Sequence, residues 1–130
     1  MYTFNAAGKA LKIVMSVKNL TASTVSAVTL RRVVDSDIDD SLGNDFARTL
    51  DSMFAWNDTT GHGMVLQHLG GPAHSTRVYN FIDESLVTVC NPASDTTPIL
   101  GTDGIGSIDY NLGNIAAGAT KSATVAYVRI

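Results

Sequence analysis

Short β-branched segments, separated by polar or glycine-containing turns, recur along the whole chain of 130 residues. In residues 11–18 the apolar side chains of Leu11, Ile13, Met15 and Val17 recur at every second position, the period of a strand with one buried face. Seven more segments have a similar β-rich character: residues 24–34, 50–56, 63–69, 77–81, 85–90, 107–112 and 121–129. About eight short strands with a turn signal every ten residues or so predict an all-β fold, an antiparallel β-sandwich formed as a single domain over residues 1–130.

Composition supports this fold class and excludes two kinds of partner. Charged residues make up 16% of the chain, and Glu, which favours helices, occurs once. The net charge is −3 and there is no Lys between Lys18 and Lys121, so the continuous basic surface that nucleic acids require is missing. No apolar run approaches the ~18 residues of a membrane-spanning helix. We therefore expect no nucleic-acid partner and no membrane insertion.

The order of the segments suggests how they pair. Residues 11–18 and 24–34 are expected to form a hairpin across the polar turn at residues 19–23. Residues 45–53 also allow two turns of helix. The opening strand (residues 9–18) and the closing strand (residues 123–130) are regular and β-rich, and an unpaired strand at a sheet edge can add a strand from a neighbouring copy of the chain.

Both ends of the chain resemble a known family. The segment Leu11-Lys12-Ile13-Val14-Met15-Ser16-Val17-Lys18-Asn19 is similar to the first strand of bacterial extracellular immunoglobulin-like repeat modules. Residues 112–128, with a Leu-Gly-x-aliphatic-x-x-Gly turn before a Ser/Thr/Val-rich strand, are similar to the final strand pair of these modules. The resemblance implies an immunoglobulin-like sandwich with extra strands in its long middle insert, secreted or on the cell surface as a module of a longer exported protein.

An acidic segment at residues 35–45 is the first candidate site. Asp35, Asp37 and Asp39 stand at alternate positions, and Asn44 or Asp45 could complete an oxygen shell for calcium. The segment lacks the Gly and the bidentate Glu of an EF-hand loop. Two alternatives are a solvated loop neutralised by its flanking arginines and a loop that binds a basic partner. The flanking arginines are Arg31, Arg32 and Arg48.

A second candidate site is an aromatic platform for a carbohydrate, formed by Trp56 with polar groups from Asn57, Asp58 and Tyr79. The alternative is that Trp56 belongs to the core. The evenly spaced His62, His68 and His74 lack a nearby Cys or Glu to complete a zinc sphere, so ordinary structural histidines are expected. Cys90, the single cysteine, is expected to be a buried apolar residue.

Catalytic motifs are missing from the sequence. It contains no G-x-S-x-G, G-x-x-x-x-G-K-[ST] or H-E-x-x-H pattern. The predicted function is therefore a non-enzymatic structural or adhesive module of a secreted or cell-surface bacterial protein, whose partner is a protein or a glycan at the cell surface. The alternatives are a self-associating filament subunit, which binds neighbouring copies of itself, and a carbohydrate-binding module that uses Trp56.

Overall fold

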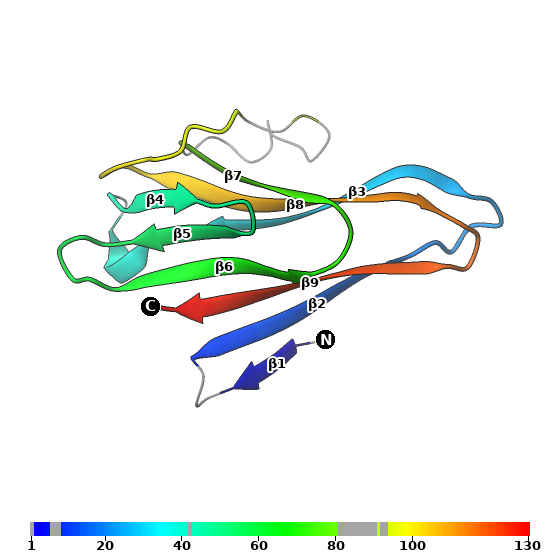
Figure 1. The fold of residues 1–130 in the computed structure, drawn as a ribbon, viewed down its shortest axis with the longest axis horizontal. Helices are drawn as coiled ribbons and strands as arrows, with labels where there is room; N and C mark the ends of the chain where they lie inside the picture. The colour runs from blue at the N-terminus through cyan, green and yellow to red at the C-terminus, as the bar shows by residue number, and fades with distance from the viewer. Residues whose placement is uncertain (1, 6–8, 42, 81–90, 92–93) are drawn as a thin grey trace.

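The computed structural model describes residues 2–5, 9–41, 43–80, 91 and 94–130, and it is a two-layer antiparallel β-sandwich (Figure 1). One sheet has the order β1 (Tyr2–Asn5), β2 (Ala10–Lys18), β9 (Thr120–Arg129), β6 (Gly63–Gly70), β5 (Ser52–Trp56) and β4 (Asp45–Arg48). The other has the order β3 (Val25–Asp35), β8 (Gly104–Ile115) and β7 (His74–Asn80), and a short 3₁₀ turn, η1 (Ile38–Asp40), follows β3. The predicted fold class is confirmed.

The predicted hairpin between the first two segments is wrong. β2 pairs with β1 and β9, whereas β3 pairs with β8 in the opposite sheet. The polar turn between β2 and β3 therefore carries the chain from one layer to the other. The buried Asn19 holds this crossing, because its amide nitrogen donates to the carbonyls of Ser23 (2.7 Å) and Ile115 (2.9 Å).

Residues 45–53 form no helix; they form β4, a tight turn and the start of β5. The turn is closed by a hydrogen bond from Thr49 N to Ser52 O of 2.8 Å. Phe46 and Met53, one on each strand, are both fully buried. Two pairing strands deliver these side chains into the space between the sheets, and this tertiary burial overrides a weak local helical preference.

The strands expected at the sheet edges are interior. β9 lies between β2 and β6, and β2 lies between β1 and β9. The outer strands are instead β1 and β4 in one sheet and β3 and β7 in the other. On β4 the backbone of Phe46 exchanges two hydrogen bonds with Ile99, and on β7 the backbone of Val78 is occupied by Asp95 and Thr96. Among the described strands, these contacts protect two of the four outer edges from pairing with another chain.

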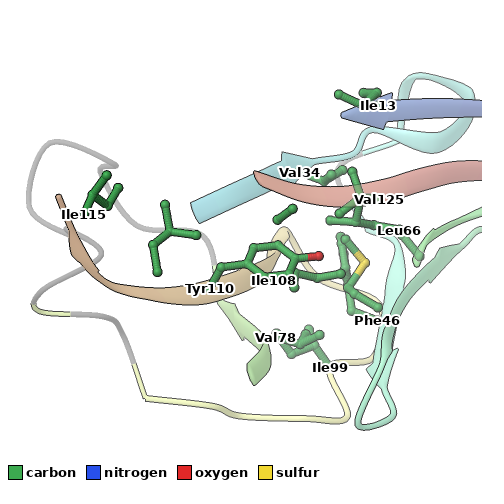
Figure 2. Close-up of a cluster of buried hydrophobic side chains, with 14 residues drawn as sticks. Ile13, Val34, Phe46, Leu66, Val78, Ile99, Ile108, Tyr110, Ile115 and Val125 are labelled. Carbon is green, nitrogen blue, oxygen red and sulfur yellow. The ribbon is translucent and has the colours of Figure 1, made fainter. Parts of the chain in front are cut away.

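The core fills the space between the layers (Figure 2). Its members come from both sheets: Ile13, Phe46, Leu66 and Val125 face Val34, Val78, Ile108 and Tyr110. Gly104 and Gly106 lie within β8. A Cβ at Gly104 would meet the ring of Phe46 at 2.8 Å, and one at Gly106 would overlap Met53. Glycine here allows large side chains of the facing sheet to approach the β8 backbone.

Two predictions from the sequence concern the undescribed residues or an absence. The strand expected at residues 85–90, with Cys90, lies outside the described residues. The described part of the chain contains no helix long and apolar enough to cross a lipid bilayer.

Candidate functional site

The outer face of the three-stranded sheet carries a charged cluster that the sequence did not single out. Asp109 lies in the middle of β8, and the strand register places Arg31 of β3 on one side of it and Ser75 of β7 on the other. Because Ile108 and Tyr110 point into the core, Asp109 between them points outward. The sequence indicates this position only through a charged residue, Asp109, between the apolar Ile108 and Tyr110 in a predicted strand.

Asp109 binds two arginines. Arg31 makes a bidentate pair, with Nε 2.6 Å from Oδ1 and Nη2 3.0 Å from Oδ2 of Asp109. Arg77 of β7 adds a contact from Nε to Oδ2 of 3.3 Å. The side chains of Arg31 and Asp109 are only 8% and 13% exposed, so this pair is firmly held, while Arg77 is 31% exposed. Two guanidinium groups against one carboxylate leave the cluster with a net charge of about +1 at neutral pH.

An open groove of about 420 Å³ lies over this cluster. Such a volume is within the ~300–1,000 Å³ usual for small-molecule sites. Its lining includes polar side chains from all three strands, among them Thr29, Ser75, Arg77, Asp109 and Asn111. These side chains stand on paired strands rather than on a loop, so their relative positions are fixed by the sheet.

The acidic segment brings two of its carboxylates to a third that is remote in sequence. Oxygen atoms of Asp35, Asp37 and Asp103 lie within 4.8 Å of one another. Asp103 comes from the loop before β8, and it reaches the cluster because Asp35 pairs with Ile105 at the end of the β3 and β8 ladder. Spacing along the chain could not reveal this third carboxylate.

The other predicted calcium ligands have different partners. The carboxylate of Asp39 contacts His62 Nδ1 at 3.0 Å and accepts a hydrogen bond from the Thr60 hydroxyl, and the Thr60 hydroxyl and then His62 lower the pKa of Asp39. Asn44 and Asp45 are buried. Asn44 donates to the Ser36 carbonyl, and Asp45 accepts from the backbone of Gly101, so both tie loops together. Asp39, Asn44 and Asp45 are thus engaged with partners other than Asp35 and Asp37.

The arginines expected to neutralise this segment bind elsewhere. Arg31 pairs with Asp109, Arg32 donates to the hydroxyl of Tyr127 at 2.7 Å, and Arg48 pairs with Asp95. The partner of Arg31 is on the paired strand β8, that of Arg32 is on β9 in the other sheet, and that of Arg48 is in the loop before β8. These three contacts all lie outside the acidic segment.

Calcium binding stays a prediction, now centred on Asp35, Asp37 and Asp103. We expect millimolar calcium to raise the melting midpoint of chelator-treated protein, since a ligand that binds only the folded state stabilises it. Asp37→Asn should remove this rise, and the matched change Asp58→Asn, in an exposed turn, should keep it. Identical midpoints with calcium and with chelator in the unmodified protein would show that the three carboxylates do not bind calcium.

The predicted aromatic platform is divided by the fold. Trp56 is half-buried at the end of β5, and its indole nitrogen donates to Asp58 at 2.7 Å. The carboxamide oxygen of Asn57 accepts from the backbone of Thr59 and Thr60, so it shapes the turn. Tyr79 belongs to the other sheet and is 2% exposed, too buried to stack on a sugar. Only Trp56 and Asp58 keep the predicted surface character.

Two of the three histidines stack on each other. The rings of His68 and His74 lie 3.8 Å apart between centroids, His68 Nδ1 is 3.0 Å from the Tyr110 hydroxyl, and His74 Nε2 is 3.0 Å from Asp51. His62 lies apart, against Asp39. Burial, followed by the proximity of His74, lowers the pKa of His68, and burial raises the pKa of Tyr110 to about 12.

The lowered pKa of His68 predicts a loss of stability on mild acidification. Its pKa in the folded state lies below the value of about 6.5 expected in the unfolded state. The unfolded chain therefore binds more protons, so His68 makes stability fall as the pH drops through about 6.5 towards the folded-state pKa. Urea denaturation between pH 7.5 and 5 should show this fall, and His68→Gln should reduce it. If stability falls equally in His68→Gln and the parent, and falls less in His62→Gln, the acid sensitivity comes from His62 and not from His68.

Comparison of the chain with protein-family models, curated proteins and solved structures found no match. The site must therefore be interpreted from its own geometry.

Proposed function

We propose that this chain is a non-enzymatic adhesive module of a secreted or cell-surface bacterial protein, of immunoglobulin-like type, and that it binds its partner through the groove on the outer face of the three-stranded sheet. The observation that carries the proposal is the arrangement of polar side chains from β3, β8 and β7 around an open hollow of about 420 Å³. The immunoglobulin-like type and the bacterial surface setting rest on the sequence resemblance.

The groove has the properties of a prepared binding surface. The bidentate contact between Arg31 and Asp109 holds two nearly buried charges in a defined geometry. Replacing such a pair with apolar residues is often neutral or stabilising, so the pair is weak evidence for a purely structural purpose. The pair also favours binding, because Asp109, fixed by Arg31, holds Arg77 in place at the groove. A side chain fixed before binding loses less entropy when the partner arrives.

The test is to fill the groove without disturbing the core. Ser75 lines the groove, is half-buried and points outward, so Ser75→Tyr should occupy part of the hollow. The matched control is Ser16→Tyr, which places the same ring on the outer face of the larger sheet, where Ser16 is exposed. Binding of the labelled protein to arrays of immobilised glycans and extracellular proteins is the measurement.

The parent protein and Ser16→Tyr should bind the same array members, and Ser75→Tyr should lose at least about 90% of the signal, as expected when a side chain blocks the centre of a binding site. Equal binding by both tyrosine variants would contradict the proposed site. A signal lost in Trp56→Ala and retained in Ser75→Tyr would transfer the binding site to the turn after β5.

A further inference from the structure

Accepting the groove as the binding site of the proposed function, we infer that its ligand is an acidic saccharide, whose sugar carboxylate pairs with Arg77 and whose hydroxyl groups bind the neighbouring polar side chains. The inference rests on the charge of the groove, the kind of hydrogen-bonding groups that it offers, and its position on the sheet.

The local charge of the groove is opposite to that of the chain. The whole sequence has a net charge of −3, yet Arg77 and Asp109 line the groove and a second arginine, Arg31, pairs with Asp109 beside it. Asp109 is already engaged by both arginines. Arg77 contributes only its Nε to that contact, and its terminal nitrogens have no partner among the described residues. A guanidinium group positioned in this way matches the two oxygens of a carboxylate.

Two further polar side chains at the groove can donate hydrogen bonds. Asn111 is exposed, its side-chain oxygen accepts from the backbone of Gly113, and its amide nitrogen has no partner within the described part of the chain. Ser75 adds a hydroxyl group. A surface with donors in excess favours a ligand rich in acceptor oxygens, and a uronic acid provides these in its carboxylate, ring and hydroxyl oxygens.

The position of the groove favours a saccharide over an acidic peptide. Extended peptides commonly bind a β-protein by adding a strand at a sheet edge, with their side chains in adjacent pockets. This groove lies across the face of the sheet, over the central strand β8, where the backbone is already paired on both sides with β3 and β7. Small polar groups spread across three strands instead suit the distributed hydroxyl groups of a sugar.

Isothermal titration calorimetry with three probes tests the inference: a uronic-acid tetrasaccharide, a neutral tetrasaccharide of equal length, and a glutamate-rich peptide. The uronic-acid probe should bind at least about tenfold more tightly than the other two, the factor expected from one charge-assisted contact. Arg77→Gln should weaken it by about tenfold or more, and Arg77→Lys by less. Arg129→Gln, a surface change on β9, is the control and should bind like the parent.

The possible outcomes distinguish a wrong ligand from a wrong binding site. Equal affinity for the neutral and acidic sugars, or unchanged affinity in a folded Arg77→Gln protein, overturns the acidic specificity and leaves the groove proposal intact if Ser75→Tyr still blocks binding. Tighter binding of the peptide replaces the saccharide with a protein partner. Binding that persists in Ser75→Tyr removes the groove proposal itself. Absence of binding by the uronic-acid tetrasaccharide overturns the inference. Circular dichroism of Arg77→Gln confirms that the variant is folded before these values are compared.

Discussion

Phe46→Ala is expected to lower the free energy of unfolding by about 3–5 kcal/mol, the usual cost of deleting a large aromatic core side chain. Phe46 is 1% exposed, and its ring lies against the backbone of Gly104 where glycine alone makes room for it. The alanine variant would leave a hollow between the sheets that a paired strand cannot close. Urea denaturation followed by circular dichroism measures the loss.

The matched control is Leu50→Ala, which removes a large apolar side chain from the turn between β4, the strand of Phe46, and β5. Leu50 is 72% exposed, so its replacement should change stability by less than about 0.5 kcal/mol. Comparable losses in both variants would mean that Phe46 is not enclosed between the sheets, and the assignment of β4 to the larger sheet would then fail.

Asn19→Ala is expected to cost about 2–3 kcal/mol, because one side chain connects its own turn to the end of β8 and its loss leaves backbone carbonyls without partners. Its amide nitrogen donates to the carbonyls of Ser23 and Ile115, and its oxygen accepts from the backbone and the hydroxyl of Thr21. The backbone of Asn19 also exchanges hydrogen bonds with Gly118 and Ala119, in the turn before β9. Thermal and urea denaturation both measure this effect.

Two further variants separate the amide of Asn19 from its size. Asn19→Asp keeps the volume and the acceptor oxygen but loses the donor, so it should be destabilised at least as much as Asn19→Ala at neutral pH. Asn114→Ala removes an exposed asparagine whose oxygen accepts a 3.2 Å hydrogen bond from Ala27, and it should cost less than about 1 kcal/mol. A stable Asn19→Asp would refute the donor role of the amide.

The strands themselves could be predicted from the sequence, because a strand with one buried face leaves a local period of two. Ile13, buried between the half-exposed or exposed neighbours of β2, is such a case. The pairing of the strands could not be predicted in the same way. The crossing at Asn19 depends on a hydrogen bond to Ile115, far along the chain, and a polar turn looks alike whether it closes a hairpin or joins two sheets.

The candidate sites show the same limit. Asp35 and Asp37 can be recognised from their alternate positions along the chain, whereas Asp103 joins them only through the ladder between β3 and β8. Arg31 was recognised as an arginine beside an acidic loop, yet it pairs with Asp109 across that same ladder. The sequence allows Tyr79 to be a surface aromatic, but its side chain is buried in the structure and cannot contribute to a binding platform. Local chemistry can be found in a sequence, but the selection of partners requires the sheet register.

Amide chemical-shift mapping tests the central claim most directly, since it locates a bound ligand without any substitution. We predict that titration with the uronic-acid tetrasaccharide shifts the backbone signals of Ser75, Arg77 and Asn111 most strongly, and that the turn at Trp56 to Asp58 stays unchanged. Largest shifts at that turn, or shifts on other surfaces while the outer face of the three-stranded sheet stays unchanged, would contradict the assignment of the groove as the binding site.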